Sequence, residues 1–164
     1  MIQVISVSKA DLTTIQSIAH RTWPDTFGKI LSPAQIDYML HRFYDIPNLE
    51  AQLEQGHSFL LADEDGEKLG FTGFELNQIP GTTKIHKIYI LPTAQGKGIG
   101  KRLIKSISEI ALDNQQESLL LNVNKYNKGA IDFYEYLGFV NIKTEVIDIG
   151  EGYVMDDFVF ELKL

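Results

Sequence analysis

The stretch that decides the fold is Gln95-Gly96-Lys97-Gly98-Ile99-Gly100, which lies between an apolar strand at residues 88–91 and a segment with helical periodicity. The first N–H groups of a helix have no intrahelical acceptor and carry the positive end of the helix dipole. Glycines in front of these groups let a ligand approach the backbone closely. A strand, a glycine-rich loop and a helix in this order therefore predict a binding site for a phosphate-bearing ligand.

Two familiar phosphate-binding motifs do not fit this loop. A P-loop needs Gly where Gln95 stands, and it needs a Mg²⁺-binding hydroxyl where Arg102 stands. A dinucleotide fingerprint needs a third Gly where Lys101 stands and an acidic residue at the end of the next strand. The next apolar run, residues 119–124, ends in amides instead. The sequence therefore disfavours nucleotide hydrolysis and NAD binding.

The loop does fit Q-x-x-G-x-G, a pattern that resembles the pyrophosphate loop of the GNAT superfamily of N-acetyltransferases. Asn127, Ala130 and residues 133–139 (FYEYLGF) resemble the family signature N-x-x-A-x-x-F-Y-x-x-L-G-F, and residues 87–92 resemble the strand before the loop. These three ordered motifs cover about a third of the chain. The resemblance implies one α/β (α+β) domain over residues 1–164. Its mixed, mostly antiparallel sheet would have six or seven strands, four or five flanking helices and a splayed strand pair for acyl-CoA.

Composition agrees with a single globular domain. The 164 residues suffice for one core, and a net charge of −7 argues against a nucleic-acid partner. The absence of cysteine excludes disulfides and a cysteine nucleophile, and it suits a reducing compartment. No signal peptide is apparent, and no apolar run approaches the roughly 20 residues that span a bilayer. We therefore expect a cytoplasmic protein without a membrane partner, and the sequence leaves open whether it forms a homodimer.

Periodicity and helix-capping residues predict the order of the elements. Helices are expected after Ser8, from Pro33 to about Phe43, after Pro47, after the glycine loop, and from about Lys128 to Leu137. Strands are expected at residues 2–7, 58–62, 68–76, 84–91, 119–123, 139–146 and 157–164. Antiparallel hairpins come first and strand-helix-strand units later, which is typical of a mixed α/β domain.

The GNAT resemblance implies acetyl-CoA as cosubstrate. Backbone N–H groups of the glycine loop would bind the diphosphate, and the strand before it would pair with the pantetheine arm. The Ile90 N–H would stabilise the developing oxyanion. Asn127 matches an Asn that bonds the arm, and it also reads as a helix N-cap. The implied contact residues are Ile88, Tyr89, Ile90, Gln95, Gly96, Lys97, Gly98, Ile99, Gly100, Lys101, Asn127 and Tyr134.

The resemblance implies a general acid but leaves the general base open. Tyr134 matches the family tyrosine that protonates the departing thiolate, and its alternative role is that of a core aromatic. Many members carry a Glu near the start of the strand before the loop, where this chain has Lys84 and His86. His86 is a candidate base, Glu75 is a candidate that acts through water, and a chain of water molecules is the third reading. The histidine spacing predicts no metal site.

The acceptor is expected to be a small amine. Residues 22–27 and 150–160 resemble those of PaiA-type bacterial polyamine acetyltransferases. Trp23 and Phe27 would then hold an alkylamine by apolar and cation–π contact, and their alternative is a packed helix end. Candidate partners for a second ammonium are Asp25, Glu151, Asp156 and Asp157. Protein or peptide N-terminal acetylation and a CoA-binding sensor without turnover remain as alternative functions.

Overall fold

The computed structural model describes residues 1–164 as seven strands, five α-helices and two short 3-10 helices. The helices are η1 (Lys9–Asp11), α1 (Leu12–Phe27), α2 (Pro33–Tyr44), α3 (Ile46–Glu54), η2 (Pro92–Ala94), α4 (Ile99–Asp113) and α5 (Lys128–Tyr136). The strands are β1 (Ile2–Ser6), β2 (His57–Glu64), β3 (Glu67–Ile79), β4 (Thr82–Ile90), β5 (Ser118–Asn124), β6 (Val140–Gly150) and β7 (Tyr153–Lys163). The predicted order of strands and helices is confirmed.

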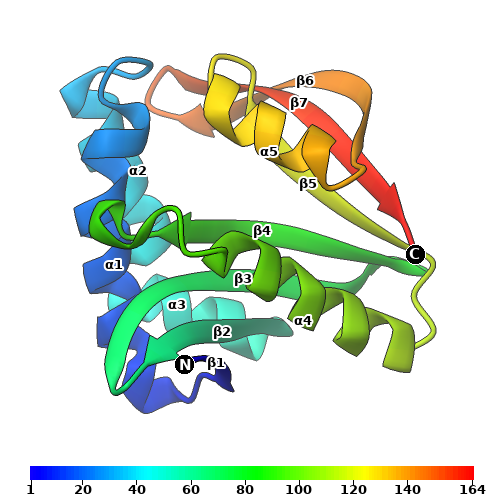
Figure 1. Ribbon diagram of the computed structural model, residues 1–164. Helices are drawn as coiled ribbons and strands as arrows, with labels where there is room; N and C mark the ends of the chain where they lie inside the picture. Colours follow the sequence, from blue (N-terminus) through cyan, green and yellow to red (C-terminus); the bar gives the residue numbers. More distant parts are fainter.

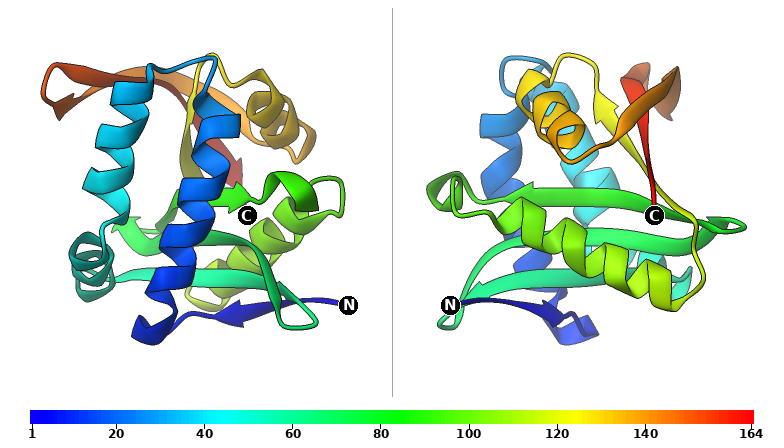
Figure 2. Two further views of the ribbon diagram at one scale, coloured as in Figure 1. Left: turned by 90° about the vertical axis from the view of Figure 1, so that its left-hand side faces the viewer. Right: turned by 45° about the vertical axis from the view of Figure 1, so that its right-hand side comes forward.

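One sheet with strand order β1-β2-β3-β4-β5-β7-β6 forms the middle layer. Only β4 and β5 pair in parallel, and every other neighbouring pair is antiparallel. Helices α1, α2 and α3 cover one face, while α4 and α5 lie on the other (Figures 1 and 2). No helix is at once long enough and apolar enough to cross a membrane.

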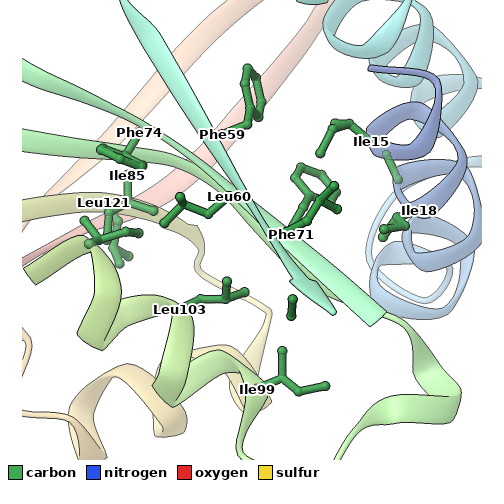
Figure 3. Close-up of a cluster of buried hydrophobic side chains, with 14 of the residues drawn as sticks. Ile15, Ile18, Phe59, Leu60, Phe71, Phe74, Ile85, Ile99, Leu103 and Leu121 are labelled. Atoms are coloured by element: carbon green, nitrogen blue, oxygen red, sulfur yellow. The ribbon is translucent and has the colours of Figure 1, made fainter. Parts of the chain in front are cut away.

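The core is built on both faces of the sheet because successive strand residues point to opposite sides. On β2, Phe59 faces α1, and the next residue, Leu60, faces α4 (Figure 3). Ile15 and Ile18 of α1 lie beside Phe71 on the first face. All five side chains are nearly inaccessible to solvent. The sheet is therefore fixed between two apolar layers, which hold its strands in register.

The sheet splits open between β4 and β5. Parallel pairing joins Thr82–Ile85 to Ser118–Leu121 and then stops, so that β4 continues beside β3 and β5 continues beside β7 (Figure 1). A bulge marks the point of divergence, because Lys87 faces Gly73 while Ile85 faces Phe74, and His86 between them has no partner on β3. The splayed strand pair implied by the GNAT resemblance is thereby confirmed.

The last hairpin is longer than the sequence predicted. Strands were expected to end at residue 146 and to resume at 157, and both limits were wrong, because β6 reaches Gly150 and β7 begins at Tyr153. A two-residue turn of Glu151 and Gly152, both with positive φ (54° and 79°), joins the strands. Turns with two positive φ values match the twist of paired strands. Asp156 and Asp157 therefore both lie within β7.

Candidate active site

The glycine loop leaves its backbone open to a ligand. Gly96 and Gly98 have φ values of +85° and +75°, a conformation that side chains other than Asn and Asp rarely adopt. A Cβ atom at either position would meet no heavy atom within 4 Å. Gly98 is also the N-cap residue of α4. The loop thus offers free space directly in front of the positive end of a helix.

Unpaired N–H groups line this space. The first helical hydrogen bond of α4 runs from the Arg102 N–H to the Gly98 oxygen at 3.1 Å, so residues 99–101 have no intrahelical acceptor. The N–H groups of residues 96–98 also make no backbone hydrogen bond. Lys97 forms a 3.0 Å ion pair with Glu64 of β2, whereas Lys101 is exposed and has no ion-pair partner. The arrangement fits an anionic group such as a diphosphate.

The open edge of β4 continues from this loop. The Leu91 N–H donates to the Leu69 oxygen of β3 at 2.9 Å. Because successive N–H groups of a strand point to opposite sides, the N–H of Ile90 is directed away from β3 and toward the gap beside β5. A strand edge without a partner can pair with an extended ligand and supply a fixed donor to a carbonyl oxygen.

Three elements converge at the mouth of this gap. A Cβ atom at Gly100 on α4 would lie 3.0 Å from the ring of Phe133 on α5 and 3.7 Å from Ile90 of β4. Gly100 is therefore needed for the close approach of the two helices. This packing brings the residue after Phe133, Tyr134, to the side of the gap.

Tyr134 is buried except for 7% of its surface. Its ring packs against Phe139 and Phe160, at centroid distances of 5.6 and 6.4 Å. Its hydroxyl has no hydrogen-bond partner within the chain, although the side chain is held firmly. Burial raises the pKa of Tyr134. The pKa of Tyr89 on β4 is raised mainly by burial and to a smaller extent by the charge of the nearby Tyr134 phenolate. The Tyr134 hydroxyl is thus protonated, free to donate a hydrogen bond, and close to β4.

Asn127 acts as a helix cap in this structure. Its Oδ1 accepts a hydrogen bond from the Ala130 N–H at 3.3 Å, at the start of α5. This is the structural role that the sequence allowed. Its Nδ2 makes no hydrogen bond to the protein, so a contact with a cofactor arm is compatible with the capping role and stays a prediction.

A cluster of His57, Glu75 and His86 lies where β4 bulges. The Nε2 atom of His86 is 3.0 Å from Glu75 Oε1, and the Nε2 atom of His57 is 3.5 Å from the same oxygen. The two imidazole rings stack at 4.3 Å with an angle of 7°. Burial lowers the pKa of His57, and it lowers the pKa of His86 to about 4 despite the opposing hydrogen bond with Glu75. Both rings are therefore neutral near pH 7.

The sequence predicted His86 and Glu75 as separate candidates, and the structure brings them into direct contact. His57 was missed. It sits opposite Glu75 in the pairing of β2 with β3, so only knowledge of the strand register reveals it.

A family model described as the acetyltransferase (GNAT) family matches residues 13–139, which span the glycine loop, β4 and Tyr134. The chain belongs to the GNAT family. It is accordingly an acyltransferase of the N-acetyltransferase type.

Relatives and solved structures agree with this family. An uncharacterized N-acetyltransferase of Lactobacillus delbrueckii is 26% identical over 157 residues, 92% of this chain and 91% of the relative. A spermidine N(1)-acetyltransferase of Thermoplasma acidophilum is 27% identical over 160 residues, 94% of this chain and 96% of the relative. The crystal structure of a PaiA N-acetyltransferase from Thermoplasma acidophilum in complex with coenzyme A superposes with a TM-score of 0.83 at 25% identity, and covers 100% of this chain and 99% of that one.

The predicted acceptor wall of this GNAT protein is packed rather than open. Trp23 and Phe27 are only 3% and 8% exposed. Their rings lie 4.6 Å apart, and they pack against Tyr89 at 5.7 and 6.3 Å. Both side chains thus pack in the core against Tyr89 of β4, as the packed-helix alternative implied. Direct contact of these two residues with an acceptor stays a prediction.

Two of the four predicted acidic partners are already engaged. Asp157 accepts a hydrogen bond from Asn122 Nδ2 at 3.2 Å, and burial raises the pKa of Asp157. Lys84 donates to the Oδ1 atom of the same Asn122. Asp156 forms a 2.7 Å ion pair with Lys125. Only Asp25 and Glu151, which are both exposed, have no such partner.

Lys87 is a buried cation beside the cluster of His57, Glu75 and His86. Its Nζ lies 5.3 Å from the ring centroid of Tyr44 and 6.0 Å from that of Phe43, and it has no ion-pair partner. Burial lowers the pKa of Lys87 to about 8. The aromatic faces offset part of the cost of burying the charge, and no carboxylate offsets the rest.

Replacing Lys87 by Met is expected to stabilise the protein at pH 7, because the change removes a buried charge and keeps the apolar packing. Between pH 8 and 10 the unfolded chain still binds the Lys87 proton while the folded chain has lost it. As the pH is raised through this range, the free energy of unfolding of the wild type should therefore increase relative to that of Lys87→Met, by at most about 1.4 kcal/mol per pH unit. Urea unfolding of both proteins at pH 7, 8, 9 and 10 measures this difference. Parallel pH profiles would contradict a lowered pKa.

Proposed function

We propose that this GNAT protein transfers the acetyl group of acetyl-CoA to a primary amine of a small molecule, with a polyamine as the favoured acceptor class. The observation that carries the proposal is the open glycine loop, with its unpaired N–H groups, that leads into the free edge of β4 beside Tyr134. The polyamine class is supported by the Thermoplasma spermidine acetyltransferase, which covers nearly the whole chain.

Each step of the reaction has a candidate group on this chain. The N–H groups of residues 96–101 would hold the diphosphate, and the edge of residues 88–90 would align the pantetheine arm. The Ile90 N–H would bond the thioester oxygen as negative charge builds on it. The amine nitrogen would attack the carbonyl carbon directly in a ternary complex. A C–N bond then forms, the C–S bond breaks, and Tyr134 gives its proton to the departing sulfur.

His86 is the favoured group for taking the proton from the amine. It lies at the bulge where β4 leaves β5. Its imidazole is neutral near pH 7, and Glu75 at 3.0 Å can stabilise the imidazolium that forms. A pKa of about 4 makes His86 a weak base. Two other routes therefore remain in the proposal, in which Glu75 acts through water or a chain of water molecules carries the proton.

An acceptor screen tests the proposal. The purified protein is incubated with acetyl-CoA and either spermidine, an N-terminal peptide or no acceptor, and release of the CoA thiol is followed with a thiol reagent. We expect release that depends on spermidine, with a mass shift of one acetyl group on the amine. Turnover with the peptide and not with spermidine would indicate that the acceptor is a protein N-terminus and not a polyamine. Tight CoA binding without turnover on a broad amine panel would indicate a sensor.

A further inference from the structure

Three metal-ligating groups meet at one end of the sheet. His57 is the first residue of β2, Glu75 is its register partner on β3, and His86 occupies the bulge of β4. The ligating atoms of the three side chains all lie within 4.8 Å of one another. The bulge is responsible for this arrangement, because the extra residue turns the His86 ring over the His57 ring.

We propose that His57, Glu75 and His86 form a binding site for Zn²⁺ or a transition metal with similar ligand preference. Two imidazole nitrogens and one carboxylate oxygen are a ligand set that zinc favours, with a fourth position left for water. The three side chains are 13%, 26% and 25% exposed, so an ion can reach them from solvent. Only small shifts are needed, since both Nε2 atoms already lie within 3.5 Å of the same carboxylate oxygen.

The protonation state of the cluster suits a metal. A histidine binds a metal through a neutral ring, and burial keeps both rings neutral near pH 7 by lowering their pKa values. With the metal on Nε2, the single proton of each neutral ring would lie on Nδ1. The site therefore needs no deprotonation of an imidazolium before the ion binds.

Two features of the surroundings limit the affinity. Lys87 and Lys84 lie near enough to lower the pKa of His86, and their positive charge also opposes a metal ion. In addition, Nδ1 of His57 is buried without a hydrogen-bond partner, whereas ligating histidines normally donate this second N–H to an acceptor. We therefore expect a lower zinc affinity than that of a structural zinc site, so that occupancy depends on the free metal concentration.

A bound metal would also act on the reaction. With the metal on Nε2 and the ring proton on Nδ1, His86 would have no free lone pair, and the Glu75 carboxylate would be bound to the ion, so neither group could accept a proton from the amine. This consequence rests on the proposed function, whereas metal binding itself does not. We expect zinc to inhibit acetyl transfer and a chelator to restore it.

Calorimetric titration of the EDTA-treated, dialysed protein with ZnCl₂, in the absence of acetyl-CoA, tests the site. We expect one ion per chain and at least about tenfold weaker binding in Glu75→Gln and His57→Phe. Glu75→Gln keeps the size of the side chain, and His57→Phe keeps a ring to stack on His86. The matched control is His41→Asn. His41 is exposed and also lies near two carboxylates, those of Asp45 at 3.1 Å and Asp37 at 3.6 Å, and its loss should leave zinc binding unchanged.

The outcomes separate the site from the function. No zinc binding by the wild type, unchanged binding in folded Glu75→Gln and His57→Phe, or loss of binding in His41→Asn would each overturn the site. Thermal unfolding without metal establishes that each variant is folded. Zinc binding by a protein that acetylates no amine would support the site and count against the proposed function alone. Zinc binding without inhibition would support the site and exclude His86 and Glu75 as the base.

Discussion

Replacing Tyr134 by Phe is expected to lower kcat by about 10²- to 10⁴-fold, the usual contribution of a positioned general acid. The substitution removes one hydroxyl that makes no hydrogen bond within the chain, and it keeps the ring packed against Phe139 and Phe160. The loss should therefore fall on proton transfer to the departing thiolate and not on folding. Single-turnover acetylation of spermidine measures the chemical step without interference from product release.

Tyr136→Phe is the matched control, because Tyr136 lies two residues further along the same helix and is 77% exposed. Its kcat should equal that of the wild type. The affinity of both variants for CoA, measured by calorimetry, should change by less than about twofold, since a lost acid weakens the transition state and not the bound ground state. An unchanged kcat in Tyr134→Phe would remove this tyrosine from the mechanism.

Local signals in the sequence were enough to predict much of the fold. The second helix was expected to begin at Pro33, and in the structure the hydroxyl of Ser32, the residue before it, accepts a hydrogen bond from the Gln35 N–H at 3.1 Å. The glycine loop, the strand before it and the helix after it were likewise expected from neighbouring residues. Such features depend on contacts within a few residues, and for that reason a single sequence reveals them.

The features that the sequence did not reveal depend on contacts between distant segments. His57 joins Glu75 only through the register of β2 on β3, and His86 reaches them only because β4 bulges at that residue. Neither of these two contacts can be inferred from the spacing of the histidines along the chain. The burial of Lys87 under Tyr44 was equally hidden, because a lysine in a strand is normally expected to face solvent.

The burial of the predicted acceptor wall, Trp23 and Phe27, shows a different limit. Trp23 and Phe27 were matched to an acceptor-binding segment by resemblance, and the periodicity of α1 alone would have assigned them to the core, where they lie. The same two aromatic rings support Tyr89 on β4. Their substitution would therefore disturb the cofactor edge as well as any acceptor, so loss of activity in such variants would not by itself identify an acceptor contact.

Replacing Gly98 by Asp is expected to weaken acetyl-CoA binding strongly while the fold is kept. Position 98 has φ +75° and ψ 18° and caps α4, and Asp and Asn are the side chains that best tolerate this conformation and the cap position. A Cβ atom there meets no neighbour within 4 Å. The new carboxylate would instead face the diphosphate across the loop. One added negative charge at about 5 Å costs roughly 1–3 kcal/mol, or about 5- to 150-fold in affinity.

Gly98→Asn isolates this charge effect, because Asn has the shape of Asp without its charge. Calorimetric titration with CoA should find Asp weaker than Asn, and the gap should narrow as salt is raised, since salt screens exposed charges. Steric obstruction alone would weaken both variants equally at every salt concentration. Equal affinity of the wild type and of Gly98→Asp would mean that the diphosphate lies elsewhere. In that case the first turn of α4 would not bind the cofactor, and the assignment of Ile90 and Tyr134 to the same site would fail with it.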